Sequence, residues 1–249
     1  MNSSKKDYRK LYQLQDKFLK WWISLDLPFY LTGGTALGRF YLNHRFSEDL
    51  DFFVNADPQY VNYVAALKDK IGTRFAVNIS QSLFSEDFTR LFIEDDHYLL
   101  KIELVNDVGY HAGNTINTGF GKIDTPLNIL SNKLTALVGR DEPKDIYDIL
   151  SIALNYSFNW QDIFHHSKQK SVINELDVEL RLVSFPVEWL ENVNWLIGPL
   201  ERNTTKSHLR QIADDFFLGR INSLGINKIP IEKAILLNPF PDLKSGYAG

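Results

Sequence analysis

Apolar side chains recur every three or four positions along several stretches of the chain, which is the pattern of helices with one buried face. Near the start, Leu11, Leu14 and Phe18 lie on one such face, with lysines on the other. This spacing predicts a helix from about Tyr8 to Ser24. Further helices are predicted over residues 35–42, 60–71, 126–138, 143–156, 160–168 and 207–217.

Alternation of polar and apolar residues marks a second kind of segment. Leu50, Phe52 and Val54 alternate with Asp49 and Asp51. A strand here would turn its apolar residues to one face and its two carboxylates to the other. Short apolar runs bounded by polar turns predict other strands over residues 28–31, 75–80, 88–93 and 98–105.

The order of these segments predicts the organisation of the chain. Helices interleave with strands first, then strands follow one another, and only helices remain after Asp124. We expect an α/β (α+β) fold, because a sheet built in this order needs helices to cover it. The predicted domains are a sheet domain with its N-terminal helix over 1–124 and a helical domain over 125–249.

Composition narrows the chemistry that is available. The chain has no cysteine, which excludes disulfide frameworks, thiolate zinc sites and Cys nucleophiles. A formal net charge of -4 gives no global attraction to nucleic acid, so a polynucleotide substrate would need a local basic surface. No apolar run approaches the roughly 20 residues of a membrane helix, and the N-terminus lacks the apolar core of a secretion signal. The expected location is cytoplasmic, with no membrane partner.

The most informative stretch is 31–54, LTGGTALGRFYLNHRFSEDLDFFV. Gly33 and Gly34 permit a tight turn and a close backbone approach to phosphate, and the Thr35 hydroxyl can donate to a phosphate oxygen. Asp49 and Asp51 would offer the oxygen ligands that Mg²⁺ prefers. Taken alone, a Gly-Gly pair is commonly only a turn and the aspartates only an exposed sheet face, but their order and spacing together favour a site for metal-bound phosphate.

The turn followed by Asp-x-Asp resembles the signature of nucleotidyltransferases of the DNA polymerase β type. More narrowly, the string resembles the AbiEii/AbiGii toxin family through GGTAL, His44-Arg45, Ser47 and Asp49-Leu50-Asp51. A looser resemblance extends over 128–150. The resemblance implies a polymerase β-like nucleotidyltransferase sheet domain, an NTP as substrate and Mg²⁺, or Mn²⁺, as cofactor. This chain has Gly-Thr where many relatives have Gly-Ser.

The superfamily usually supplies a third carboxylate from a neighbouring strand. The candidate is Glu103, which shares a predicted strand face with Lys101. The alternative is an ordinary surface Lys-Glu pair. Asp107 is a weaker substitute because it lies where the strand is expected to end. The predicted metal ligands are therefore Asp49, Asp51 and Glu103.

The segment NILSNKLTALVGRDEPKDIYDIL resembles later motifs of the same family, in which a helical lysine and a Lys-Asp pair complete the site. On that resemblance Lys133 and Asp145 join the catalytic set. Without it, Lys133 at the edge of an apolar stripe would be read as a lysine lying along apolar surface, and Asp145 as an acid favoured in a first helical turn. Arg45 and Arg140 are candidate phosphate clamps.

The resemblance implies an enzyme that moves an NMP from an NTP to an acceptor hydroxyl and releases pyrophosphate. It further implies a toxin-type role, a separate antitoxin as partner, and an RNA acceptor such as the tRNA 3′ end. Small-molecule and protein acceptors stay open at this point. Two alternatives of other classes also stay open. The chain could be a catalytically silent protein that binds a nucleotide or a partner, or a glycosyltransferase that uses Asp-x-Asp to bind its metal.

Overall fold

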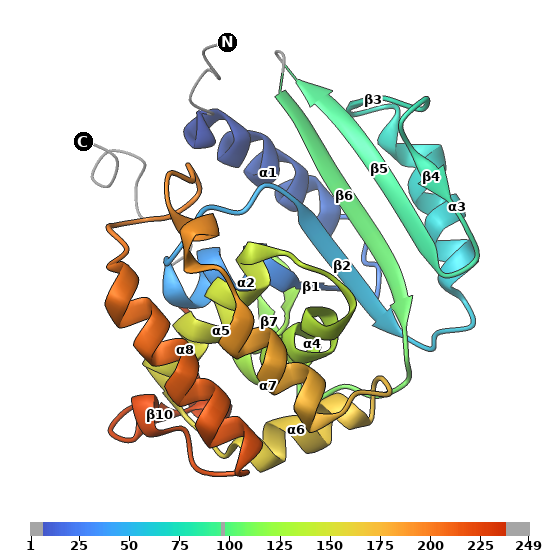
Figure 1. Cartoon of the computed structure of the whole chain (residues 1–249). Coiled ribbons are helices and arrows are strands. Elements are labelled where there is room, and N and C mark those ends of the chain that lie inside the picture. The colour runs from blue at the N-terminus through green and yellow to red at the C-terminus, as the bar shows by residue number, and fades with distance from the viewer. Residues whose placement is uncertain (1–6, 96–97, 238–249) are drawn as a thin grey trace.

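A mixed sheet of eight strands forms one side of the molecule in the computed structural model, which describes residues 7–95 and 98–237 (Figure 1). The strand order is β3-β5-β6-β2-β1-β8-β7, and β4 pairs with β5. β2 runs parallel to β6 and β1 parallel to β8, while the other pairs are antiparallel. The strands are β1 (Tyr30–Thr32), β2 (Leu50–Asn55), β3 (Ala76–Val77), β4 (Leu83–Phe84), β5 (Phe88–Asp95), β6 (Tyr98–Asp107), β7 (Ile116–Thr118) and β8 (Gly121–Ile123).

Helices α1 (Tyr8–Ile23) and α3 (Tyr60–Ile71) cover one face of this sheet. The Trp22 ring lies 4.2 Å from the Phe52 ring, and the Tyr60 hydroxyl donates to the Leu104 carbonyl at 2.8 Å. Every second residue of β2 points to this face and is buried, and burying such side chains stabilises the fold by roughly 1.5 to 3 kcal/mol each. The residues between them, Asp51 and Phe53, therefore belong to the opposite face.

The remaining helices group beside that opposite face (Figure 1). Their core is aromatic: Trp160 is fully buried and packs edge to face against Phe158 and Phe216, at 4.8 and 5.9 Å. A short parallel pair, β9 (Tyr156–Ser157) and β10 (Ile229–Pro230), adjoins them. The helices are α4 (Pro126–Gly139), α5 (Pro143–Asn155), α6 (Trp160–Lys168), α7 (Glu175–Ser184) and α8 (Arg202–Phe217).

The two predicted domains share one continuous hydrophobic core. The Phe46 amide donates to the Trp195 carbonyl at 2.7 Å, and the Leu237 amide donates to the Phe40 carbonyl at 2.7 Å. At the boundary itself, the buried Asp124 accepts hydrogen bonds from Thr32 and Asn128. The division into 1–124 and 125–249 stays a prediction, and many contacts cross it.

The predicted α/β (α+β) class is confirmed, with a sheet and flanking helices. The bounds of α3 agree with the predicted 60–71. The helix expected over 35–42 begins earlier, as α2 (Gly33–Leu37), and continues into a π-helical turn (Gly38–Leu42). The sequence analysis missed α7, the short strands β4, β7, β8, β9 and β10, and the first turn of α8.

Among the described residues, none of the helices combines the length and the apolar character needed to cross a lipid bilayer.

Candidate active site

The glycine turn joins β1 to α2 and brings the backbone against the aspartates. Gly33 has a φ of +67°, and a Cβ there would lie 2.5 Å from Asp51 Oδ2. A Cβ on Gly34 would lie 2.1 Å from Arg45 Nη2. Gly33 is therefore required both for its left-handed conformation and for the close approach of a carboxylate. Gly34 leaves the space through which the Arg45 side chain passes.

Three carboxylates gather on the sheet next to this turn. Asp51 in β2 is in register with Glu103 in β6 and with Thr32 in β1, and Asp49 lies two residues before Asp51. Burial, together with the charges of Asp49 and Glu103, raises the pKa of Asp51 to about 7. The sheet therefore holds more negative charge at this point than its own surroundings neutralise.

Two cations of the chain already contact this acidic group. The Lys101 ammonium lies 2.8 Å from Asp49 Oδ2 and 3.4 Å from Glu103 Oε1. Arg90 lies 2.7 Å from Glu103 Oε1. Among the described residues, no group of three or more His, Cys, Asp or Glu side chains is gathered closely enough to hold a metal ion. The oxygen donors and the excess negative charge at Asp51 still fit a hard divalent cation, which would compete with Lys101 for Asp49 and Glu103.

Removing this competing ammonium should tighten metal binding. We expect Lys101→Met to raise the affinity for Mn²⁺ by about threefold to tenfold, because a partly exposed positive charge close to the ligands opposes a second cation. Isothermal titration with Mn²⁺ measures the change. Lys17→Met is the matched control, since it breaks a separate ion pair with Asp95 of 2.7 Å. An unchanged or weaker Mn²⁺ affinity in Lys101→Met would contradict the competition.

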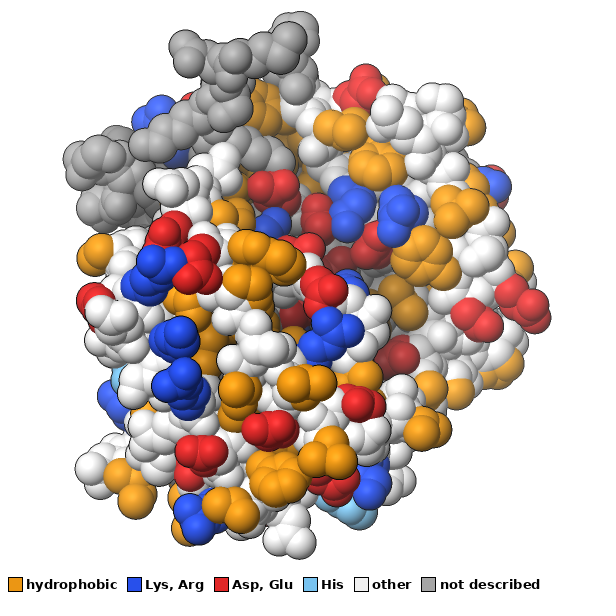
Figure 2. All heavy atoms as spheres, viewed as in Figure 1, with side chains coloured by type: hydrophobic (Ala, Val, Ile, Leu, Met, Phe, Trp, Pro, Cys, Tyr) orange, Lys and Arg blue, Asp and Glu red, His pale blue; other side chains and the backbone are white. Residues whose placement is uncertain are grey.

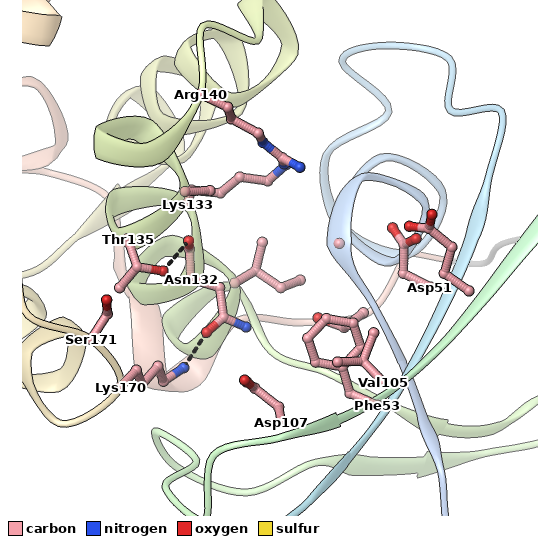
Figure 3. A pocket seen from close by; sticks show the side chains of 15 residues that line it. Asp51, Phe53, Val105, Asp107, Asn132, Lys133, Thr135, Arg140, Lys170 and Ser171 are labelled. Carbon is pink, nitrogen blue, oxygen red and sulfur yellow. Dashed lines mark hydrogen bonds between the residues drawn. The ribbon is translucent and has the colours of Figure 1, made fainter. Parts of the chain in front are cut away.

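A cavity of about 450 Å³ lies between the sheet and α4. Its sheet wall carries Gly33, Asp51 and Glu103, and its helical wall carries Lys133 and Arg140. Figure 3 shows Lys133 and Arg140 reaching from α4 toward the side on which Asp51 stands. Figure 2 shows acidic and basic side chains around a hollow at this place. Five of the predicted site residues are thus brought to one cavity.

Lys133 and Arg140 are both held by Asp145. The Lys133 ammonium is 2.6 Å from Asp145 Oδ1 and 2.8 Å from Asp148 Oδ2, and Arg140 donates to Asp145 at 2.7 and 3.1 Å. Burial opposes the charge on Lys133, but Asp148 and Asp145 outweigh it and raise the pKa of this lysine. Lys133 is therefore a fixed positive charge in the cavity wall. Asp145 is buried behind it and does not line the cavity.

Arg45 does not lie where a phosphate clamp was expected. Its guanidinium is buried and donates to both carboxylate oxygens of Asp148, at 2.6 and 2.8 Å. His44 contacts the same carboxylate at 2.8 Å. Burial would raise the pKa of Asp148, but Arg45 and Lys133 hold it well below its usual value. Arg45 and His44 thus support Lys133 from behind, and neither lines the cavity.

Thr35 also has a role other than the expected one. Its side chain is fully buried, and its hydroxyl donates to the Asp49 carbonyl. This bond ties the start of α2 to the segment before β2. The contribution of Thr35 is therefore to fix the backbone of Asp49, and Thr35 does not line the cavity. Asp49 itself stands at the edge of the acidic group and outside the cavity lining.

The sequence analysis missed the other end of the cavity. Asn132, Thr135 and Lys170 line it together with Asp107, which had been considered only as a substitute for Glu103 (Figure 3). The signal was present in α4, where Asn128, Asn132 and Thr135 recur at helical spacing and make a polar stripe beside Lys133. The position of Lys170 after α6 had no comparable signal.

Comparison with known proteins supports the same assignment. Residues 21–118 match the family described as nucleotidyl transferase AbiEii toxin of a type IV toxin-antitoxin system, so the predicted resemblance is confirmed over this part of the chain. No match was found among curated proteins.

Solved structures show the same fold. A Helicobacter pylori protein provisionally assigned as a nucleotidyltransferase has a TM-score of 0.57 at 20% identity, covering 85% of this chain and 95% of its own. Helicobacter pylori JHP933 has a TM-score of 0.56 at 20% identity, and the match covers 86% of this chain and 94% of JHP933. The nucleotidyltransferase toxin MenT4 of Mycobacterium tuberculosis has a TM-score of 0.52 at 18% identity, and the match covers 85% of this chain and 84% of MenT4. The family match and this fold support the predicted enzyme class, nucleotidyltransferase.

Proposed function

We propose that the chain is a Mg²⁺-dependent nucleotidyltransferase that moves an NMP from an NTP to an acceptor hydroxyl and releases pyrophosphate. The observation that carries the proposal is the cavity itself, which has Gly33 and the acidic Asp51 on one wall and the fixed cations Lys133 and Arg140 on the other. A triphosphate needs both a cation held by carboxylates and positive charge on its far side. The cavity offers these two features face to face.

Asp49 and Asp51 would hold the metal ion, and Glu103 would complete its ligands. When bound, Mg²⁺ would neutralise phosphate charge and favour deprotonation of the attacking hydroxyl. Mn²⁺ offers the same oxygen preference and can replace it. Glu103 lines the cavity with Asp51 and its charge acts on Asp51, which supports Glu103 as the third carboxylate that a catalytically silent protein would lack. That observation favours the enzyme over the silent alternative.

Other residues of the chain would each have a separate role in the reaction. The turn at Gly33 lets the phosphates approach the backbone next to Asp51. As the acceptor oxygen bonds to the α-phosphorus, the bond from that phosphorus to the bridging oxygen breaks, and negative charge accumulates on pyrophosphate. Lys133 and Arg140 would stabilise this charge. Asp145 would act as a positioning residue, because it holds both cations and lies outside the cavity.

For the acceptor we propose RNA, with the tRNA 3′ end as the first candidate, and a toxin-type role in the cytoplasm opposed by a cognate antitoxin. The support is the matched family, described as a toxin of a toxin-antitoxin system, and the similarity of fold to MenT4, described as a nucleotidyltransferase toxin. The charge of the chain adds no support for RNA, since its formal net value is -4.

Labelled nucleotides distinguish the candidate reactions. The purified protein is incubated with Mg²⁺, total RNA and each of the four α-³²P-labelled NTPs in turn. We expect label in RNA of tRNA size and pyrophosphate in equal amount, because both products come from one bond exchange. Asp69→Asn, an exposed acid on α3, should leave the yield unchanged.

Two results would change the assignment. Pyrophosphate release without labelled RNA would contradict the RNA acceptor and direct the search to protein or small-molecule hydroxyls. Absence of pyrophosphate with every NTP, together with transfer from a labelled nucleotide-sugar, would replace nucleotidyl transfer by glycosyl transfer.

A further inference from the structure

The sheet face that carries Asp51 continues beyond the cavity, across β6 and β5 (Figure 1). Side chains alternate along both strands: Leu91, Leu100 and Ile102 are buried against the helices behind the sheet, and the residues between them belong to the face of Asp51. In the view of Figure 1, no described helix lies in front of β5. The residues on this open face are Leu99, Lys101, Glu103 and Val105 of β6 and Phe88, Arg90 and Phe92 of β5.

Strand register connects this open face to the cavity. Glu103 lies opposite Asp51 on one side and opposite Arg90 on the other. One step along the sheet, Val105 lies opposite Phe88. Asp51, Glu103 and Val105 all line the cavity. The sheet wall of the cavity and the exposed face of β5 therefore form one continuous surface.

The apolar side chains of this face do not serve the core. Phe88 and Phe92 are partly buried, yet among the described residues neither belongs to the hydrophobic core or packs against it. Leu99, on the same face of β6, is 40% exposed. The solvated face of an antiparallel pair is ordinarily polar. Several apolar side chains together on such a face, next to a cavity, indicate an interaction surface.

Basic side chains stand between these aromatic rings. Two nitrogens of Arg90 lie 2.7 Å from Glu103 Oε1, and the guanidinium lies 5.2 Å from the centre of the Phe88 ring. A guanidinium has five N–H donors, so contact with one carboxylate oxygen leaves donors for a phosphate. Lys101 lies opposite Phe92 and adds a second positive charge. Figure 2 shows basic and hydrophobic side chains together beside the hollow. Aromatic rings interleaved with basic groups are typical of surfaces that bind single-stranded nucleic acid.

The direction of the reaction determines where an acceptor has to lie. Under the proposed function, pyrophosphate leaves toward Lys133 and Arg140 on the α4 wall. The attacking and leaving oxygens of a phosphoryl displacement are roughly in line, on opposite sides of the phosphorus. The acceptor hydroxyl therefore enters from the sheet side, beside Glu103. The molecule that carries this hydroxyl then extends over β6 and β5.

We propose that Phe88, Arg90 and Phe92 form a platform that binds the single-stranded 3′ end of an RNA acceptor. Unpaired bases stack on the two rings, and phosphates contact Arg90 and Lys101. The terminal hydroxyl is then presented to the cavity beside Glu103. The proposal rests on the proposed function and adds the surface that recognises the acceptor. Since the bases of a duplex are already stacked on one another, the platform selects RNA that ends in unpaired nucleotides.

Binding of RNA without any NTP tests the platform apart from turnover. Two fluorescein-labelled RNA hairpins share one stem; the first is blunt, and the second carries a short unpaired 3′ overhang. Each is titrated with the full chain in Mg²⁺, and fluorescence anisotropy measures its affinity. We expect the overhang hairpin to bind about 10- to 100-fold more tightly than the blunt one, because its bases can stack on the protein.

Aromatic variants assign this preference to its residues. Phe88→Ala and Phe92→Ala should each weaken binding of the overhang hairpin by about tenfold and leave the blunt hairpin unchanged. Phe92→Tyr should keep the affinity, because it keeps a ring on which a base can stack. The matched control is Phe217→Ala, which removes an exposed ring on α8 outside the cavity lining. Its two affinities should equal those of the unaltered protein.

The salt dependence of binding tests the contact of Arg90 with phosphate. Arg90→Met should make the slope of log affinity against log salt concentration shallower by about 0.7, the value for one phosphate contact with a single strand. Arg210→Met, at an exposed position on α8, should leave the slope unchanged. Thermal melts show whether each variant is folded. The slope of Arg90→Met carries the test if the alanine variants are not folded.

The possible failures have different meanings. Equal binding of the two hairpins, or unchanged overhang binding in both alanine variants, would overturn the platform. A dimer in light scattering that Phe92→Ala dissociates would also overturn it, because a second copy of the chain would then occupy this face.

Uncleavable α,β-methylene analogues of the four NTPs distinguish failure of the platform from failure of the proposed function. With Mg²⁺, they should bind the unaltered protein and Phe92→Ala equally. Analogue binding without any preference between the hairpins overturns the platform alone. If none of the analogues binds, the proposed function falls, and the platform falls with it.

Discussion

Asp51→Asn is expected to reduce nucleotidyl transfer by about a thousandfold or more and to stabilise the metal-free protein. Under the proposed function the carboxylate holds the metal, yet in the metal-free fold it is partly buried and lies close to Asp49 and Glu103. Replacing it with a neutral amide of the same shape removes that repulsion, which we expect to raise the free energy of unfolding by about 1 to 3 kcal/mol. Transfer assays and thermal melts in chelator measure the two effects.

The gain in stability should depend on pH in a defined direction. The pKa of Asp51 rises from 3.8 to about 7 on folding, so the folded state binds this proton more tightly than the unfolded state does. Stability from this group is then lost as pH rises between these two values, and the loss is complete above the higher one. The advantage of Asp51→Asn should widen over this interval and level off beyond it. An Asp51→Asn protein less stable than the unaltered chain at pH 8 would contradict the account.

Asp148→Ala is expected to lower the free energy of unfolding by about 3 to 5 kcal/mol, because it leaves the buried cations Arg45 and Lys133 without their shared carboxylate. For a chain of this size, the melting temperature should fall by roughly 10 °C. Urea unfolding at neutral pH measures the loss. The control is Asp214→Ala, an exposed acid on α8, which should change stability by less than about 0.5 kcal/mol.

The difference in stability between Asp148→Ala and the unaltered protein should disappear only in strongly acidic solution. Folding depresses the pKa of Asp148 well below 3.8, so its contribution to stability is complete above that value and is lost as pH falls through the lower, folded-state pKa. The gap between Asp148→Ala and the unaltered protein should therefore persist at pH 5. A loss below about 1 kcal/mol at neutral pH would mean that solvent reaches Arg45 and Lys133 and screens them.

The predicted elements that agree best with the structure are those with one clearly buried face. Helix α3 is such a case, since Tyr60, Val64 and Leu67 recur at helical spacing and are all buried. Helix α7 escaped prediction because its apolar residues lie on several sides: Val178 and Leu182 are buried, while Leu176 is exposed. The strands β7 and β8 are three residues each. They pair with each other, and β8 joins the sheet through β1, which is distant in sequence, so local pattern alone did not reveal them.

Among the site residues, too, some could be predicted from the sequence and others could not. The glycine turn and Asp51 were predicted from their order along the chain, and Lys133 from the resemblance of its segment to later motifs of the family; the structure brings Gly33, Asp51 and Lys133 to one cavity. Arg45 could not be assigned, because its role depends on the space left by Gly34 and on the position of Asp148 in a helix about a hundred residues later, a tertiary relation. Asp107 was undervalued for a related reason, since strand position alone does not tell which end of a cavity a side chain reaches.

The charges behind the cavity alternate in sign from the interior to the rim, in the order Arg45, Asp148, Lys133, Asp145, Arg140. Each inner member balances two neighbours, so a lone replacement harms both of them and a reversal at one position calls for a second reversal beside it. Substitutions among these five residues would therefore have to occur in pairs, and the first substitution of each pair would destabilise the protein until the second one compensated for it. The row thus ties the evolutionary freedom of the rim arginine to that of a guanidinium deep in the interior.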